Sequence, residues 1–348
     1  CRTALVDKYG ANRVEIMKGV LLINLGSPKN LELSSVKNYL REFLSDDYVL
    51  DIPKLIQRIL VNFIIVPFRS SKTKEAYESI WTSEGSQLII NTELIGKKLQ
   101  KKINLPVEIA MRYQEPSIKD SVLRLLKNGC DEITAVPLYP HYAQATSLTT
   151  KLEIESVIND IDPDIKLSIS SPFYCEDGYI NSLSDSIKNH LPNEFDYLLF
   201  SYHGIPERHV KKMDPTSSHC LNIKDCCDVS SEAHDYCYKH QVLSTSELCA
   251  KQLGLSKEQW GVSFQSRIGP GWLKPFTDKI LEELPKQGIK KIAVVCPAFI
   301  ADNLETLEEV DIRARETFLE CGGKDFTFIP CINDNDLWID FLANYIEE

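Results

Sequence analysis

The sequence predicts an α/β protein, and three observations lead to that fold class. Its apolar runs are continuous rather than alternating, which is typical of strands in a parallel sheet covered on both faces. Amphipathic helical patterns lie between these runs, and strand alternating with helix defines the α/β class. The runs also recur in matching pairs along the chain. They are residues 19–25 (GVLLINL), 132–138 (EITAVPL), 196–202 (DYLLFSY) and 291–297 (KIAVVCP).

Two segments show the helical pattern clearly. Residues 34–44 (SSVKNYLREFL) place their apolar positions on one face behind a serine cap, and residues 117–129 (SIKDSVLRLLKNG) do the same before Gly129. The apolar positions are Val36, Tyr39, Leu40, Phe43 and Leu44 in the first segment, and Ile118, Val122, Leu125 and Leu126 in the second.

The paired runs indicate two similar halves. Residues 21–28 (LLINLGSP) match 198–206 (LLFSYHGIP), and 129–137 (GCDEITAVP) match 288–297 (GIKKIAVVCP). We therefore expect two similar Rossmann-like domains, each a doubly wound parallel sheet, with a ligand cleft between them at the carboxyl ends of the strands. The predicted division is an N-terminal extension 1–17, a first α/β domain 18–168 and a second α/β domain 169–348.

Charge and composition narrow the functions. The chain has 348 residues, 43% of them hydrophobic, which is enough for two cores. Its formal net charge of -11, from 39 basic and 50 acidic residues, argues against nucleic acid as a partner. Residues 1–18 show neither a secretory signal nor an apolar spanning run, so we expect a cytoplasmic protein. The 11 cysteines are then expected to be reduced thiols or metal ligands.

A histidine stands where the second predicted sheet would bind its ligand. His203 ends an apolar run, and Gly204 and Pro206 allow the backbone to turn directly after it. The alternative, a histidine that merely ends a strand, has equal weight on this observation alone.

Acidic residues follow the last predicted strand run. The helix expected there places four carboxylates, Asp302, Glu305, Glu309 and Glu316, on one face. Like charges at this spacing repel by a few tenths of a kcal/mol, roughly, so a bound cation would stabilise them, although a solvated helix face is the alternative. Glu305 begins the helix and is expected to face His203. An imidazole and a carboxylate can move protons while further carboxylates hold a divalent cation, which indicates metal insertion.

Four segments together resemble ferrochelatase. They are residues 19–28 (GVLLINLGSP), 201–209 (SYHGIPERH), 263–279 (SFQSRIGPGWLKPFTDK) and 299–312 (FIADNLETLEEVDI). The resemblance covers nearly the whole chain from about Lys18 and implies insertion of ferrous iron into protoporphyrin IX, the last step of haem synthesis, without an organic cofactor. The YHGIP segment looks like the protoporphyrin-using branch. The alternatives are a chelatase for coproporphyrin or cobalt, and a non-catalytic carrier of haem or metal.

The resemblance also implies roles for particular residues. It makes His203 and Glu305 the catalytic pair. The implied metal-handling residues are His203, Glu305, Asp302 and Glu309. The implied substrate-binding residues are Arg69, Tyr77, Ser86, Met111, Arg112, Tyr113 and Trp272. One departure is visible, because Asn303 stands where some relatives carry a histidine.

A cysteine-rich insertion, residues 214–241, follows the His203 segment. Its four cysteines are Cys220, Cys226, Cys227 and Cys237, and His219, His234 and His240 lie among them. Four thiolates suit either a 2Fe-2S cluster or a structural zinc ion, and free thiols on a loop are the third alternative. Many ferrochelatases carry a 2Fe-2S cluster and others do not. We place the cluster ahead of zinc.

Residues 54–71 (KLIQRILVNFIIVPFRSS) form an apolar, partly helical stretch. It is too short and interrupted to span a bilayer, so one interpretation is a lip over the ligand slot that touches the membrane surface. The other, of equal weight on the residues alone, is a core helix leading into a strand. The family resemblance favours the lip, because porphyrin and haem are apolar cargo.

Overall fold

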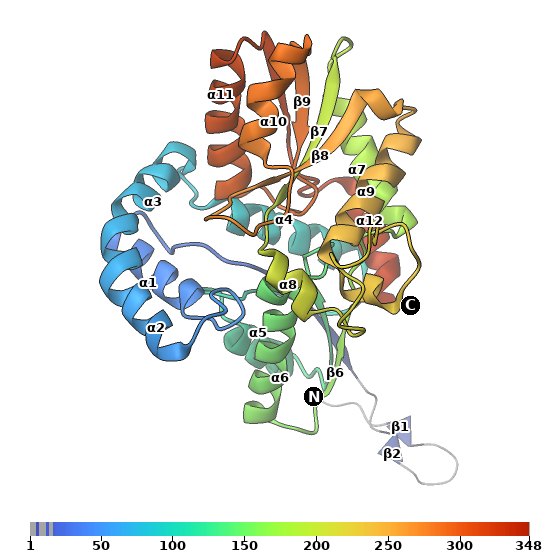
Figure 1. Cartoon of the computed structure of the whole chain (residues 1–348). Helices are drawn as coiled ribbons and strands as arrows, with labels where there is room; N and C mark the ends of the chain where they lie inside the picture. Colours follow the sequence, from blue (N-terminus) through green and yellow to red (C-terminus); the bar gives the residue numbers. More distant parts are fainter. Residues whose placement is uncertain (1–4, 7–11, 14–16, 348) are drawn as a thin grey trace.

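The computed structural model describes residues 5–6, 12–13 and 17–347, which contain two parallel four-stranded sheets surrounded by helices (Figure 1). A short antiparallel pair, β1 (Leu5–Val6) and β2 (Asn12–Arg13), precedes the sheets. Of the predicted extension 1–17, only these two strands and Met17 are described.

The first sheet has the strand order β4-β3-β5-β6. Its strands are β3 (Lys18–Asn24), β4 (Val107–Met111), β5 (Glu132–Pro137) and β6 (Lys166–Ile169). The continuous apolar run of β3 is explained by burial on both faces. Leu21 and Ile23 pack in one core cluster while Val20 and Leu22 pack in another.

The second sheet repeats this arrangement with the order β10-β9-β7-β8. Its strands are β7 (Tyr197–His203), β8 (Trp260–Gln265), β9 (Lys291–Val295) and β10 (Asp325–Ile329). In both sheets the first strand along the chain lies between the second and the third. The paired sequence runs correspond to β3 with β7 and to β5 with β9. The predicted α/β fold with two similar parallel sheets is confirmed.

Helices cover both sheets, and some helices of the first half extend outward as an arm (Figure 1). In the first half they are α1 (Leu33–Leu44), α2 (Lys54–Ile59), η1 (Leu60–Ile65), α3 (Val66–Ile80), α4 (Gln87–Lys102), α5 (Ile118–Lys127), η2 (Gln144–Leu148) and α6 (Thr149–Ile161). In the second half they are α7 (Asp177–His190), α8 (Glu207–Lys212), η3 (Glu232–Tyr236), α9 (Tyr238–Gln252), η4 (Lys257–Gln259), α10 (Thr277–Glu283), η5 (Leu284–Gln287), η6 (Glu305–Ala314), α11 (Arg315–Glu320) and α12 (Asp336–Glu347).

Both predicted helices exist, but only one has the expected cap. Ser117 caps α5 by accepting a hydrogen bond from the Asp120 N–H at 3.1 Å. The serine cap predicted for the other helix is wrong, because α1 begins after Glu32 and includes Ser34.

The two sheets share one hydrophobic core. Val136 of the first sheet and Phe200 of the second belong to the same buried cluster. The last helix, α12, packs on α4 and α7, and its first turn is tied to the first half by Lys98, whose ammonium lies 2.9 Å from Asp336. The first sheet ends at Ile169, one residue beyond the predicted division at 168/169.

The helix after β9 differs from the expected α-helix. Residues Glu305–Ala314 form a π-helix, η6, which continues as α11. Its wider turn brings residues five apart, rather than four, into hydrogen-bonding register. Stretches of π-helix occur frequently at functional sites.

Candidate functional site

His203 occupies the carboxyl end of β7, as predicted, and its ring orientation is fixed by one hydrogen bond. The Nδ1 atom lies 2.7 Å from the Gly204 carbonyl oxygen. A carbonyl oxygen only accepts, so Nδ1 carries a hydrogen, and in the neutral ring Nε2 holds the lone pair. The ring is partly buried and stands edge-on to Phe299, with ring centroids 6.4 Å apart. The geometry therefore presents Nε2 as a proton acceptor.

The backbone after His203 is held close to β8. The Gly204 N–H donates to the Gln265 carbonyl oxygen at 2.8 Å, and a Cβ on Gly204 would lie 2.7 Å from that same oxygen. Glycine is required here by close approach rather than by an unusual turn. Trp272 packs on the other side, since its Cε3 would be 3.4 Å from that Cβ and its backbone pairs with Pro206. The structure thus brings Trp272 beside His203.

Glu305 begins η6 and is partly buried. Burial raises the pKa of its carboxyl because the charged form loses water, and the His203 ring opposes this shift electrostatically. The neighbouring carboxylates Glu309 and Glu308 add to the rise in the pKa of Glu305. A carboxyl with a raised pKa, coupled to an imidazole, exchanges protons more readily near neutral pH than a free glutamate.

Two aromatic residues, one on α1 and one on α3, also lie within electrostatic reach of Glu305. Burial raises the pKa of the Tyr39 hydroxyl, and the charge of Glu305 adds to that rise. Tyr39 on α1 stands edge-on to Tyr77 on α3, with ring centroids 6.4 Å apart, and the pKa of Tyr77 responds to the same carboxylate. Glu305 therefore lies between the second sheet and the arm.

The other two predicted acids of the metal row have different partners. Glu309 accepts hydrogen bonds from Ser266, from its N–H at 2.9 Å and from its hydroxyl at 2.5 Å. Asp302 is buried, and its oxygens accept from the Thr306 hydroxyl at 3.0 Å, the Cys331 N–H at 3.1 Å and the Asn333 amide at 2.7 Å. Asp302 thus anchors the start of η6, and sequence reasoning did not find the partners of either acid.

The predicted substrate-binding residues differ in exposure. Tyr77, Met111 and Tyr113 are buried, and Ser86 is buried at the start of α4. Arg69 is exposed on α3.

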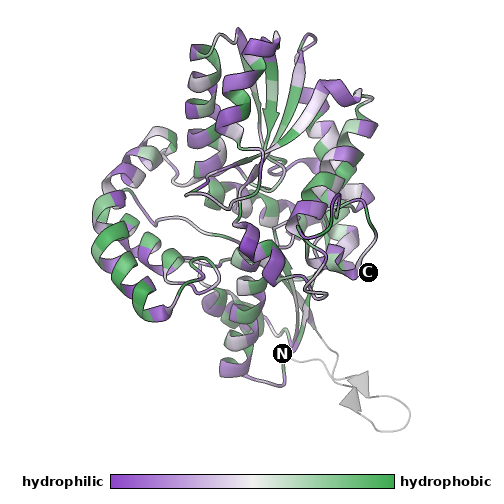
Figure 2. Cartoon of the chain, in the orientation of Figure 1, coloured by the Kyte–Doolittle hydropathy of each residue, from purple (hydrophilic) through white to green (hydrophobic). Residues whose placement is uncertain are grey.

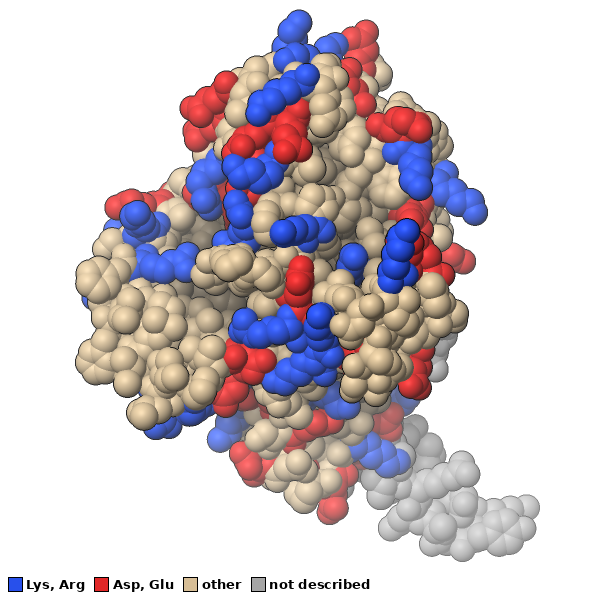
Figure 3. Space-filling view, in the orientation of Figure 1, with Lys and Arg blue, Asp and Glu red and all other residues tan. Residues whose placement is uncertain are grey.

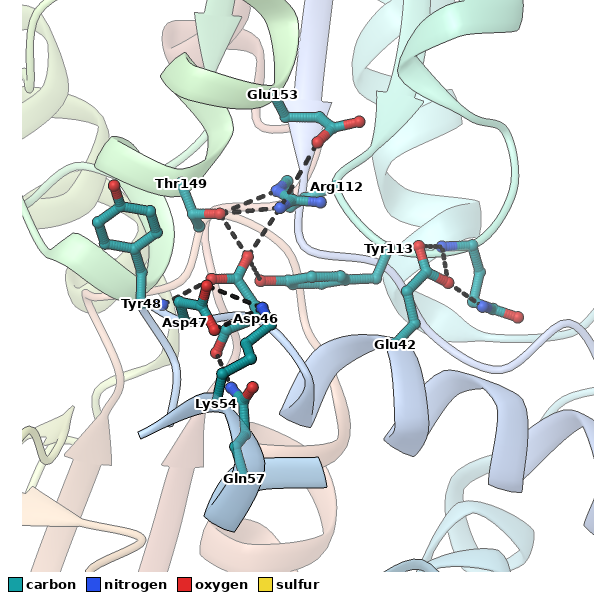
Figure 4. Close-up of polar contacts among 11 residues, drawn as sticks. Glu42, Asp46, Asp47, Tyr48, Lys54, Gln57, Arg112, Tyr113, Thr149 and Glu153 are labelled. Atoms are coloured by element: carbon teal, nitrogen blue, oxygen red, sulfur yellow. Dashed lines mark hydrogen bonds and ion pairs between the residues drawn. The ribbon is translucent and has the colours of Figure 1, made fainter. Parts of the chain in front are cut away.

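Arg112 lies in a buried polar network that the sequence did not indicate (Figure 4). Its guanidinium donates to Asp46 at 2.7 Å and to Thr149 at 2.9 Å. Thr149 and Tyr113 also donate to Asp46, at 2.5 and 3.0 Å. In this arrangement Arg112 pairs with Asp46, which follows α1 in the chain, and with Glu153 at 3.7 Å. The network holds the base of the arm against the end of β4, and nothing in the local sequence around Asp46 marks it.

The cysteine-rich insertion brings its thiols together. The pKa of the Cys237 thiol is lowered to about 6, first because the Cys227 thiol donates a hydrogen bond to it, and Cys220 acts on it in the same way. Three imidazoles contact backbone oxygens around these thiols. His219 Nε2 and His234 Nε2 lie 2.7 and 3.0 Å from the Cys226 carbonyl oxygen, and His240 Nδ1 lies 2.9 Å from that of Cys227. Since a carbonyl only accepts, each ring donates there.

Within the described part of the chain, no three His, Cys, Asp or Glu side chains are arranged to hold one metal ion. This applies both to the acids near His203 and to the cysteine-rich insertion. A 2Fe-2S cluster requires a different arrangement of ligands, because its four thiolates divide between two iron atoms and need not converge on one point.

The predicted apolar lip is a continuous helical arm formed by α2, η1 and α3, without a strand (Figure 1). The alternative of a core helix leading into a strand is therefore wrong. Hydrophobic residues are frequent along the arm (Figure 2), few charged side chains lie over its outer edge (Figure 3), and Phe63 and Phe68 are 72% and 77% exposed. We call the exposed set the lip patch; it consists of Leu55, Ile56, Ile59, Phe63, Ile64 and Phe68. None of the described helices is long and apolar enough to cross a membrane.

The same two-sheet fold occurs in chelatase structures. SirB from Bacillus subtilis with Fe3+ superposes with a TM-score of 0.55 at 13% identity, covering 96% of this chain and 95% of that chain. The sirohydrochlorin chelatase SirB from Bacillus subtilis subspecies spizizenii in complex with cobalt gives a TM-score of 0.53 at 12% identity, with the same coverage. At these identities the likeness concerns the fold, which is that of a chelatase.

Sequence comparison identifies the family. The family model named Ferrochelatase matches residues 17–348. The protein named Ferrochelatase from Pseudomonas fluorescens (strain Pf0-1) is 43% identical over 335 residues, covering 94% of this chain and 97% of that protein. The protein of the same name from Opitutus terrae is 43% identical over 333 residues, covering 94% and 96%. The chain belongs to the ferrochelatase family, enzymes that insert iron into a porphyrin.

Proposed function

We propose that this chain inserts ferrous iron into protoporphyrin IX to form protohaem, with His203 and Glu305 as the proton-handling pair. One observation carries the assignment. Glu305, whose pKa is raised by burial, lies within electrostatic reach of His203, whose Nδ1 is engaged with the Gly204 carbonyl so that Nε2 faces the substrate side in this proposal. Insertion requires both residues to act, because the free porphyrin carries two inner N–H protons that must leave before the dication enters.

The proton balance follows from these positions. His203 Nε2 accepts one pyrrole proton, and the Glu305 carboxylate accepts the second, so that the porphyrin becomes a dianion and Fe2+ takes its place between the four nitrogens. Both protons leave the site as the pair returns to its resting state. Glu309 stands one turn further along η6 and is held by Ser266, so it is placed to pass protons or iron onward. Asp302, whose oxygens are occupied, acts by positioning η6.

The porphyrin ring needs an apolar slot and its propionates need donors at the rim. We assign Trp272, which packs next to Gly204, together with Tyr77 and Met111 to the apolar walls of this slot. Arg69 and Ser86 are assigned to the propionates. We assign Arg112 and Tyr113 to supporting this wall through Asp46, rather than to direct ion pairing with the substrate.

The test is an anaerobic assay of the full chain with protoporphyrin IX and ferrous iron, following the porphyrin spectrum. His203→Ala should abolish metalloporphyrin formation, while His190→Ala, a histidine at the end of α7, should leave it unchanged. Coproporphyrin and cobalt arms separate the related chelatases. Stoichiometric binding of porphyrin without turnover by the unaltered chain would contradict the enzyme assignment and support a carrier.

We further propose that Cys220, Cys226, Cys227 and Cys237 hold a 2Fe-2S cluster. Three of these cysteines are buried, their thiols interact with one another, and the Leu221 N–H points at the Cys226 sulfur at 3.4 Å, a contact that suits a cluster thiolate. Each neighbouring imidazole donates to a backbone carbonyl through one ring nitrogen, and we assign these rings to supporting the loop around the four thiols. When bound, the cluster would stabilise the insertion; the insertion reaction itself transfers no electrons.

The cluster is tested on protein purified without oxygen. We expect equal iron and sulfide content and a visible absorption spectrum that Cys227→Ser removes and Cys175→Ser, at an exposed cysteine outside the insertion, does not. Stoichiometric zinc with no sulfide would instead show a structural zinc site, and neither metal would show free thiols.

The lip patch supports a third part of the proposal, peripheral contact with the membrane surface by a cytoplasmic protein. Contiguous exposed apolar side chains on a soluble fold mark an interaction site, and an apolar substrate and product favour a bilayer. The full chain should float with neutral phosphatidylcholine vesicles, and Phe63→Ser/Phe68→Ser should reduce that binding. Equal flotation of the variant and the unaltered chain would contradict it.

A further inference from the structure

A hollow lies beside the lip patch, on the outer side of the arm. It has a volume of about 630 Å³ and is bounded by α1, α2 and η1. Its lining residues are Arg41, Ser45, Lys54, Gln57, Arg58, Ile59, Asn62 and Phe63. Ile59 and Phe63 belong to both the hollow and the lip patch, so the two are continuous.

The hollow is separate from the proposed porphyrin slot. Tyr39 points inward to Tyr77 and Glu305, whereas Arg41, two residues further along α1, points to the other side of the helix. Residues two apart on a helix do not share a face.

Three cations surround this hollow in a chain whose formal net charge is -11. Lys54 is paired with Asp47, at 2.7 Å. Arg41 donates only to the amide oxygens of Asn62 and Asn38, at 3.0 and 3.2 Å. Neither Arg41 nor Arg58 forms an ion pair with any carboxylate in the described part of the chain, so two guanidinium charges are free to bind an anion.

Resting on the membrane contact proposed above, we propose that this hollow binds the head group of an anionic phospholipid. Such a lipid matches both features of this surface. Guanidinium groups bind phosphate through paired N–H donors, and the adjoining lip patch accepts acyl chains. A negatively charged bilayer surface attracts such side chains by about 1 kcal/mol for each lysine or arginine near it. The lip patch gives contact with any bilayer, and the hollow selects an anionic one.

The experiment compares flotation of the full chain with two kinds of vesicle, phosphatidylcholine alone and phosphatidylcholine containing phosphatidylglycerol. The unaltered chain should bind the anionic vesicles more tightly, and added salt should reduce only that difference. Arg41→Gln/Arg58→Gln should weaken binding to the anionic vesicles by roughly 10- to 30-fold and leave binding to neutral vesicles unchanged.

The matched control removes two exposed cations on the second half, Lys257→Gln/Lys286→Gln, and should retain the preference. The proposal is overturned if the unaltered chain binds both vesicles equally, or if Arg41→Gln/Arg58→Gln keeps the anionic preference. Binding to neither vesicle would overturn the membrane contact itself and this site with it, whereas iron insertion is measured separately and would stand.

Discussion

Ser266 and Glu309 form a two-point contact, in which the Ser266 N–H and hydroxyl both donate to the Glu309 carboxylate, at 2.9 and 2.5 Å. Ser266 begins the segment that carries Trp272 past His203, and it has the left-handed backbone angle φ of 63°. The contact therefore links the acidic helix η6 to the segment beside His203, the proposed proton acceptor. The contact fixes the position of the Glu309 carboxylate relative to the segment that carries Trp272.

Removing one of these two donors should affect turnover more than substrate binding. In Ser266→Ala the backbone N–H still holds Glu309, but a hydrogen bond to a charged group worth about 1.5–3 kcal/mol is lost. We expect kcat to fall by roughly 10-fold with little change in KM, measured in the anaerobic iron-insertion assay. Ser218→Ala, at an exposed serine, is the control. An unchanged kcat would show that the position of Glu309 does not matter.

The raised pKa of Glu305 predicts a trade between stability and activity. A carboxyl whose pKa is higher in the folded protein than in the unfolded chain stabilises the fold at low pH, and that contribution is lost as the pH rises through the folded pKa. Glu305→Gln should therefore raise the melting temperature at about pH 8 and make little difference below about pH 4.5. The same change should lower kcat by roughly 10²- to 10⁴-fold.

The control for this prediction is Glu316→Gln, an exposed acid on α11. It should alter neither the melting temperature nor kcat. A Glu305→Gln variant that is less stable than the unaltered chain at high pH would mean that the ionised carboxylate, not the neutral acid, is favoured in the fold.

Much of the fold could be predicted from the sequence because each of its main strands is a continuous apolar run that its own residues reveal. The continuous run of β3 and the matching run of β7 need no distant information, and their pairing correctly indicated two sheets of one design. The helix after β9 could not be predicted in detail, because π-helical and α-helical turns bury similar apolar positions. The segment just before this helix is held by a contact that the local sequence does not show, because Asp302 accepts from Asn333, 31 positions away.

The candidate site likewise has one part that the sequence indicates and another that it does not. His203 could be located because a histidine ending an apolar strand is visible in the sequence. The roles of the acids depend on which donors reach them, and Ser266 lies 43 residues from Glu309. Likewise the partner of Arg112 is Asp46, 66 residues away. Contacts at this separation leave no periodic signal, so partners of buried charges are the part that only the folded chain reveals.

Asp46 should be one of the most sensitive positions for stability. Its carboxylate accepts from Arg112, Thr149 and Tyr113, and only 5% of its side chain is exposed. Asp46→Ala breaks a largely buried ion pair, which typically costs about 3–5 kcal/mol, and leaves the more exposed Glu153, 3.7 Å away, as the remaining counter-charge of Arg112. We expect the free energy of unfolding in urea to fall by that amount. The adjacent Asp47→Ala, in which an exposed pair with Lys54 is lost, should cost less than about 1 kcal/mol. Similar losses for the two variants would contradict the structural role of the network.

His141 should make the fold sensitive to acid. Burial lowers the pKa of its imidazole to about 3, and its Nε2 lies 2.9 Å from the Thr245 hydroxyl. Because the hydroxyl of Thr245 donates to the Tyr174 carbonyl oxygen, His141 must be the donor to Thr245. A histidine with a folded pKa below its unfolded value of about 6.5 stabilises the fold above that pH, and the contribution is lost as the pH falls toward the folded pKa.

The decisive comparison is urea unfolding at about pH 7 and about pH 4.5, the window in which the unfolded His141 takes up a proton and the folded one does not. His141→Gln retains an N–H donor for Thr245 but cannot titrate, so it should lose less stability on acidification than the unaltered chain, by about 2 kcal/mol or more. His190→Gln should behave like the unaltered chain. His209, whose pKa burial lowers to about 4, would account for part of the acid sensitivity that remains. If His141→Gln lost stability with pH as steeply as the unaltered chain, the buried imidazole would not be the group that couples folding to acid.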